Sequence, residues 1–205
     1  MPKTSAPNLP NPNNWEAQFD TVFNLYKPPL DLWVVSKDGM WGIYCRASST
    51  FLVPLQYDQV WSTFFSNLWR INNGKWGMYN STTNTFPLTF EYDCIGATRY
   101  HHLWLLEKDG KLGVYNSDTN VIIVPLEYDK VKDTAFAHLW LVKKDKKWGV
   151  YNSDAGIIIV PLEYDELEDS YSKLWQGTKD GKCIVYNIET GSVLYIGNSV
   201  HLILN

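Results

Sequence analysis

Apolar residues along this chain recur in short alternating runs, and the runs repeat with a period of about 35 residues. A Leu-Trp pair opens each full copy, and the pairs begin at Leu32, Leu68, Leu103, Leu139 and Leu174. A Trp-Gly pair or a variant of it follows eight or nine residues later, starting at Trp41, Trp76, Leu112, Trp148 and Cys183. Self-similarity at a fixed period is typical of repeat architectures, so the pattern predicts a tandem array of about five copies.

Each copy contains three short runs rich in Val, Ile, Trp and Tyr, separated by turn residues, which predicts three strands and an all-β fold. The first turn carries Asp-Gly or Asn-Gly in four copies, a pair suited to two-residue hairpins. The second turn ends in a residue type that tolerates left-handed backbone in four of five copies, the five residues being Ser49, Asn84, Asn120, Gly156 and Gly191. Proline within the third run, as at Pro54 and Pro161, predicts an irregular strand.

The Leu-Trp tryptophans alternate with apolar residues on one face of the first strand, whereas the other face admits Arg70 and Gln176. We therefore expect the tryptophans to point inward. A copy of about 35 residues is too small to enclose such rings alone, so neighbouring copies must share a core. The expected core tryptophans are Trp33, Trp69, Trp104, Trp140 and Trp175 of the Leu-Trp pairs and Trp41, Trp76 and Trp148 of the Trp-Gly pairs.

The segments KDGKLGVYNSDTNVIIVPLEYDKV and KDKKWGVYNSDAGIIIVPLEYDEL resemble the WG repeat, also called the KWG repeat, which occurs in tandem in many bacterial proteins. The resemblance covers residues 15 to 195 approximately. It implies an all-β array that mediates interactions, in some cases as an immunity protein encoded near a toxin, and it implies no catalytic residues. Leu112 and Cys183 depart from the pattern, and the divergent tail indicates a capping copy at the C-terminal end.

The predicted organisation is a flexible lead followed by a single repeat domain. Residues 1–14 include four prolines and four asparagines and little that could be buried. The repeat domain, residues 15–205, divides into a partial copy and five further copies, at 15–31, 32–67, 68–102, 103–138, 139–173 and 174–205, the last one capping. The copies either follow one another as an open, solenoid-like array, which we favour, or close into a five-bladed, propeller-like ring.

Composition argues against several classes of partner. A net charge of -4 offers no basic surface for nucleic acid. No stretch of eighteen apolar residues and no signal-peptide core are present, which favours a cytoplasmic protein that does not interact with membranes. The three widely spaced cysteines form neither a disulfide framework nor a metal-ligand motif.

Candidate chemistry is sparse, and we predict no enzyme activity, no metal and no cofactor. An aspartate recurs after the third strand of the copies, at Asp20, Asp58, Asp93, Asp129 and Asp165, and its recurrence indicates a role in a turn rather than a cation site. The adjacent His101 and His102 would point to opposite faces of a strand and would seldom share one ion. No nucleophile motif or phosphate-binding loop is present.

Residues that break the repeat are the candidate binding residues. Trp61 and Phe64 have no aromatic counterparts in later copies, and such aromatics are typical of interface hot spots. Arg99 and His101 extend this candidate surface. The competing interpretation is that Trp61 and Phe64 pack over the insertion that contains Pro28 and Pro29.

We therefore predict a module that binds another protein, in one form as the immunity protein of a bacterial toxin system. The alternative is carbohydrate or cell-wall binding through a ladder of solvent-facing tryptophans, which would require the rings to point outward.

Overall fold

The computed structural model describes residues 14–24, 31–63, 67–170 and 172–197. Apart from the 3-10 helix η1 (Glu16–Gln18), all regular structure in these residues is β-strand. The chain forms two compact units, unit 1 (Met1–Tyr92) and unit 2 (Asp93–Asn205). None of the described residues belongs to a helix long and apolar enough to cross a membrane. The all-β, repeating character predicted from the sequence is confirmed.

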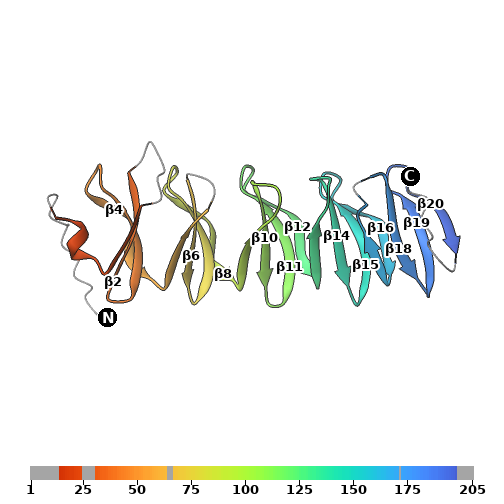
Figure 1. Cartoon of the computed structure of the whole chain (residues 1–205), viewed down its shortest axis with the longest axis horizontal. Helices are drawn as coiled ribbons and strands as arrows, with labels where there is room; N and C mark the ends of the chain where they lie inside the picture. Colours follow the sequence, from red (N-terminus) through yellow and green to blue (C-terminus); the bar gives the residue numbers. More distant parts are fainter. Residues whose placement is uncertain (1–13, 25–30, 64–66, 171, 198–205) are drawn as a thin grey trace. The chain divides into compact units, whose positions relative to one another are not determined.

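Unit 1 contains two four-stranded antiparallel sheets, in which each strand pairs with the next strand along the chain (Figure 1). Sheet A consists of β1 (Thr21–Asn24), β2 (Leu32–Lys37), β3 (Met40–Cys45) and β4 (Thr50–Tyr57). Sheet B consists of β5 (Gln59–Ser62), β6 (Leu68–Asn73), β7 (Lys75–Asn80) and β8 (Thr85–Tyr92).

Unit 2 contains three sheets of the same topology. Sheet C consists of β9 (Cys94–Ala97), β10 (Leu103–Lys108), β11 (Lys111–Asn116) and β12 (Val121–Tyr128). Sheet D consists of β13 (Lys130–Asp133), β14 (Leu139–Lys144), β15 (Lys147–Asn152) and β16 (Ile157–Tyr164). Sheet E consists of β17 (Glu166–Glu168), β18 (Leu174–Lys179), β19 (Lys182–Asn187) and β20 (Ser192–Gly197).

Each sheet therefore has four strands, and the prediction of three strands per copy is wrong. The additional strand is the short one that opens each sheet directly after the recurrent aspartate, as β13 follows Asp129. Only one residue of β13, Val131, is buried, and the same holds for Val60 in β5. Such a short strand with a single buried residue shows too little alternation to be recognised in the sequence.

The two turns of each sheet have the backbone conformations that their residues favour. All five second turns place a residue at positive φ, the residues being Ser49, Asn84, Asn120, Gly156 and Gly191. In the first turn, Gly39, Gly110 and Gly181 have φ between 72° and 77°. Lys146 takes the corresponding place in sheet D with φ of 67°, a conformation that is unfavourable for a residue with a Cβ atom.

Replacing Lys146 by glycine is expected to raise the free energy of unfolding by about 0.5–1 kcal/mol, because the strain at positive φ outweighs the added freedom of the unfolded chain. Urea denaturation of the wild type and the variant would measure the difference. Lys130→Gly, in a strand of the same sheet, serves as the control and should lower stability. A lower midpoint for Lys146→Gly would contradict the assignment of strain to this turn.

The glycine of the Trp-Gly pair is explained by a bulge in the fourth strand. In sheet D the register shifts between Trp148 and Val150, and a Cβ atom on Gly149 would lie 2.5 Å from the carbonyl oxygen of Val160. The corresponding distances at Gly42, Gly77 and Gly113 are between 2.6 and 2.9 Å. In sheet E, Ile184 pairs regularly with Ile196, and the register shift comes only after Val185. The last copy can therefore replace this glycine by a branched side chain.

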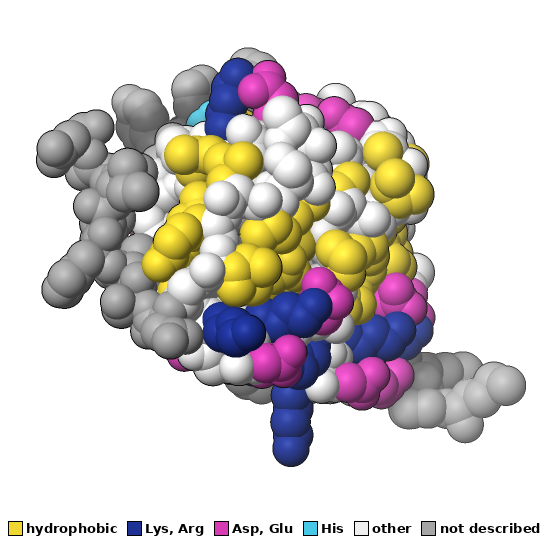
Figure 2. Space-filling view, turned by 90° about the vertical axis from the view of Figure 1, so that its right-hand side faces the viewer, with side chains coloured by type: hydrophobic (Ala, Val, Ile, Leu, Met, Phe, Trp, Pro, Cys, Tyr) yellow, Lys and Arg dark blue, Asp and Glu magenta, His cyan; other side chains and the backbone are white. Residues whose placement is uncertain are grey.

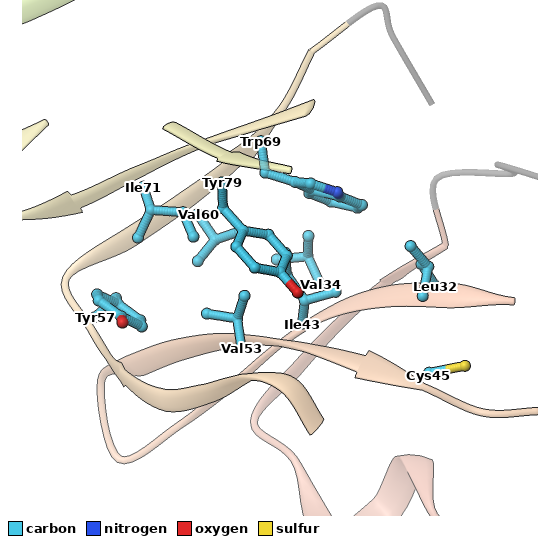
Figure 3. Close-up of a cluster of buried hydrophobic side chains, with 10 residues drawn as sticks. All are labelled: Leu32, Val34, Ile43, Cys45, Val53, Tyr57, Val60, Trp69, Ile71 and Tyr79. Carbon is cyan, nitrogen blue, oxygen red and sulfur yellow. The ribbon is translucent and has the colours of Figure 1, made fainter. Parts of the chain in front are cut away.

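Within each unit the core lies between successive sheets. In unit 1, Val34, Ile43 and Val53 of sheet A pack against Trp69 and Tyr79 of sheet B (Figure 3). In unit 2, Trp140 of sheet D packs with Val114 and Val124 of sheet C. Trp175 of sheet E packs in the same way with Val150 and Val160 of sheet D. Sheet D, which has a neighbouring sheet on each side within unit 2, is consequently apolar on both faces.

The core tryptophans predicted from the sequence differ in burial. Trp69, Trp140 and Trp175 are completely inaccessible, and Trp104 is buried. Trp33 is only half-buried, and the residues described before sheet A form no sheet that could cover it. Its face is covered instead by Trp15, whose ring centroid lies 4.9 Å from that of Trp33.

The Trp-Gly tryptophans also differ. Trp148 is buried, whereas Trp41 and Trp76 are half-buried. These two rings lie near the sheet ends that carry the first turns. The prediction placed all three in the core, and Trp41 and Trp76 are less buried there than Trp148.

Candidate functional site

A pocket of about 570 Å³ opens between sheets A and B of unit 1. Sheet A contributes Phe23, Val34 and Trp41 to its lining. The opposite wall is strand β5 with the residue that precedes it, and includes Asp58 and Trp61. The lining is mostly apolar and aromatic with few polar groups, a composition typical of ligand and partner sites.

Strand pairing brings the sheet A residues to one face. Phe23 pairs with Val34 across β1 and β2, so both side chains point toward sheet B. The rings of Phe23 and Trp41 stack nearly parallel, with centroids 6.1 Å apart and an interplanar angle of 6°. Phe23 is nevertheless 52% exposed, because the stack covers only one side of its ring.

Trp61 is the aromatic residue that β5 contributes to the pocket lining. It is 53% exposed, and its indole Nε1–H donates a hydrogen bond of 3.1 Å to Oε1 of Gln59. Gln59 lies two residues earlier on the same strand, so both side chains project from the same face of β5. This bond orients the indole, and the ring remains accessible.

Asp58 holds the first turn of sheet B. Its Oδ2 accepts a hydrogen bond of 2.9 Å from the backbone N–H of Gly74. Every sheet repeats this contact, with Asp20, Asp93, Asp129 and Asp165 accepting from the N–H groups of Asp38, Asp109, Asp145 and Asp180. The predicted structural role of the aspartate series is therefore confirmed, although each aspartate serves the first hairpin of the sheet that follows it.

In unit 2 the same aspartates also form ion pairs. Lys111 Nζ lies 2.6 Å from Oδ1 of Asp129, and Lys147 Nζ lies 2.5 Å from Oδ1 of Asp165. The lysine hydrogen bond, supported by the backbone N–H of the turn, lowers the pKa of each carboxyl group below its ordinary value. These carboxylates are thus charged and occupied by the chain's own cations.

The predicted binding residues are divided between the two units. Trp61 lines the pocket, whereas Phe64, with Pro28 and Pro29, lies outside the described residues. Arg99 and His101 belong to unit 2 and are exposed. The Nε of Arg99 lies 3.5 Å from Oδ1 of Asp133, and its backbone N–H donates to Oδ2 of the same residue at 2.8 Å. Arg99 therefore has a structural contact within its own unit.

Phe23 and Trp41 are pocket residues that sequence reasoning did not assign to binding. A signal for Phe23 was present, since it follows Asp20 by three residues as Trp61 follows Asp58. Trp41 was assigned to the core because its pair recurs in other copies. The described residues contain no group of three or more His, Cys, Asp or Glu side chains that could hold a metal ion.

A second exposed apolar surface lies on β20 at the end of unit 2. Val193, Leu194, Tyr195 and Ile196 are between 42% and 60% exposed. Figure 2 looks onto this end and shows bands of hydrophobic side chains above a row of acidic and basic ones. Residues 198–205, which follow β20, lie outside the described part of the chain.

Comparison with known proteins identifies no family, since no protein-family model and no curated protein sequence matches the chain. A chain from the crystal structure of the mitotic checkpoint complex aligns with 97% of this chain over 74% of its own length, at 11% identity and a TM-score of 0.39. Kluyveromyces lactis Hsv2 aligns with 80% of this chain over 59% of its own, at 8% identity and a TM-score of 0.37.

A chain from the crystal structure of the eukaryotic initiation factor aligns with 80% of this chain over 51% of its own length, at 11% identity and a TM-score of 0.44. For Hsv2 and this last structure, the aligned part is less than two thirds of the known chain. At these identities and TM-scores, the likenesses carry no argument about function.

Proposed function

We propose that this chain is a non-catalytic binding module that captures another protein at the pocket between sheets A and B. The observation that carries the proposal is the exposure of Phe23 and Trp61, each more than half accessible, among the residues that line a pocket of about 570 Å³. Large rings left in water lose the stabilisation that burial would give, and such rings are enriched where a partner covers them.

The polar groups of the pocket support binding rather than proton transfer. The Asp58 carboxylate accepts from the Gly74 N–H, and the Gln59 amide accepts from the Trp61 indole. Both groups thus have structural tasks that hold the pocket walls in place. A rigid frame lowers the entropy lost on binding, so it favours capture of a matching surface.

The proposed architecture is an open array of WG-type repeats, with an immunity role toward a bacterial toxin as one form of the binding function. The recurrent Trp-Gly pair and the close approach at its glycine support the assignment to one repeat type. A closed ring remains the alternative arrangement.

Carbohydrate binding is restricted by the burial of the recurrent rings. Trp69, Trp140 and Trp175 have no accessible surface, so they offer no ladder on which sugars could stack. Among the described residues, Phe23 and Trp61 in the pocket lining leave aromatic surface on which a sugar could stack. The same variant therefore tests both ligand classes.

Replacing Trp61 by alanine is expected to weaken partner capture by roughly tenfold or more, since a central aromatic anchor contributes about 2 kcal/mol or more to an interface. The melting temperature should change by no more than about 2 °C, because the side chain is already 53% exposed. Affinity purification from the native cell, quantified for the captured protein, and thermal unfolding would measure the two effects.

The matched control is Val121→Ala, which removes a side chain that is 52% exposed in sheet C of unit 2. It should capture the partner as well as the wild type does. Undiminished capture by Trp61→Ala would refute the pocket as the binding site. Binding to a glycan array that is lost in Trp61→Ala, with no captured protein, would assign the pocket to sugars instead.

A further inference from the structure

Sheet A, which forms one side of the pocket, lacks a lysine that the other four sheets contain. Met40 begins β3, and the residues that begin the corresponding strands are Lys75, Lys111, Lys147 and Lys182. Two of these lysines, Lys111 and Lys147, pair with the aspartate that precedes the next sheet. For sheet A the corresponding aspartate is Asp58, and Met40, which takes the place of the lysine, carries no charge. Met40 is itself 44% exposed.

Sheet A also differs from sheets B and D above the tryptophan of the Trp-Gly pair, where none of its described residues supplies a cation. In sheet D, Lys132 and Lys143 place their Nζ atoms 4.9 and 5.3 Å from the ring centroid of Trp148, which is only 8% exposed. In sheet B, the guanidinium carbon of Arg70 lies 5.9 Å from the ring centroid of Trp76. The repeat therefore favours a cation over this ring, as the negative face of an indole does generally.

Sheet A has uncharged residues at all three corresponding positions. Strand pairing shows that Phe23 and Ser36 of sheet A correspond to Lys132 and Lys143 of sheet D. Val34 of sheet A corresponds to Arg70 of sheet B. Among the described lysines and arginines, none lies over Trp41. The half-buried Trp41 ring and the Asp58 carboxylate instead line one pocket.

We infer that this pocket binds an arginine side chain presented by a protein partner. The guanidinium would lie against the Trp41 ring and pair with Asp58, supplying from outside the charge that lysine and arginine supply within the other sheets. Arginine fits better than lysine, because its planar group both stacks on aromatic rings and binds a carboxylate through parallel N–H groups. This inference rests on the proposed function, since it names the chemistry of the partner at the same site.

The inference is tested with short peptides on the intact chain. The probes are seven-residue Gly-Ser peptides with a single central arginine, citrulline, lysine or leucine. Citrulline has the shape of arginine without its charge. The readout is the set of indole N–H signals in spectra of the 15N-labelled protein, with Trp41 and Trp61 assigned from Trp41→Phe and Trp61→Phe variants. We expect the arginine peptide to shift these signals and the citrulline peptide to bind at least tenfold more weakly.

A variant that restores the missing charge provides the matched test. Met40→Lys should pair with Asp58 as Lys111 pairs with Asp129, and should weaken the arginine peptide at least tenfold without lowering the melting temperature. Val121→Lys adds the same charge in unit 2 on a side chain outside the pocket lining, and should bind the peptide as the wild type does.

Equal binding of the citrulline and arginine peptides would overturn the inference, as would unchanged arginine binding in Met40→Lys. The absence of any shift with the arginine peptide at millimolar concentration would overturn it as well. None of these results would affect capture of the partner at Trp61, which tests the proposed function separately. Failure of the proposed function would instead appear as partner capture that is unchanged in Trp61→Ala.

Discussion

Replacing Trp140 by alanine is expected to lower the free energy of unfolding by about 3–5 kcal/mol, the largest effect of any single truncation proposed for this chain. The ring is completely inaccessible and packs with Leu103, Val114 and Val124 of the preceding sheet. The Tyr100 ring meets it edge-on, with centroids 6.5 Å apart. Its removal leaves a cavity between two sheets, neither of which can close the gap without moving its strands.

Chemical denaturation, followed by circular dichroism, would measure the loss. Trp140→Phe is the matched comparison, because it keeps an aromatic ring in the same place. No acceptor among the described residues reaches the indole Nε1 of Trp140, so the phenylalanine variant loses no hydrogen bond and should be much less destabilised. A loss in Trp140→Ala no larger than that in the exposed Trp61→Ala would contradict the assignment of these rings to a shared core.

Replacing Gly149 by alanine is expected to lower the free energy of unfolding by about 2–3 kcal/mol, although the change adds a single methyl group. The new Cβ atom would lie 2.5 Å from the carbonyl oxygen of Val160 and 3.0 Å from that of Pro161. Both neighbours are backbone atoms of the bulged strand β16, so no side-chain rotation can relieve the contact. The bulge itself must shift, and part of the pairing between β15 and β16 would be lost.

Gly96→Ala is the control for this variant, because the nearest atom to its added Cβ lies 3.8 Å away, at an ordinary contact distance. Thermal unfolding of both variants would separate a close backbone approach from a general cost of changing glycine. If the two variants lost the same stability, the bulge would not be the reason for the glycine of the Trp-Gly pair.

Much of the fold could be predicted from the sequence because the features concerned are local. The turn residues Asn84, Asn120 and Gly156 favour positive φ through their own side chains or the lack of one, and the structure has positive φ there. The alternation around Trp140 and Trp175 predicted buried rings, and both are inaccessible. These properties depend on neighbours along the chain, which the sequence displays directly.

The candidate site could be predicted only in part. Trp61 was identified because it breaks the repeat, and it lies on the pocket wall. Phe23 and Trp41 were not assigned to the site, because their roles depend on which strands pair and which faces meet. The meaning of Met40 was likewise hidden, since a missing lysine matters only once Asp58 is seen to be the carboxylate it would pair with.

The sequence by itself determined the period of the repeat, its turns, its β-strand character and the inward side of most tryptophans, since each follows from residues close together along the chain. Only the tertiary structure decided the short strand that opens each sheet, the bulge that excludes a Cβ at Gly149, and the pocket between sheets A and B. These features arise where segments from different strands or successive sheets meet. The free energy of such contacts depends on register and facing surfaces, which local preference does not encode.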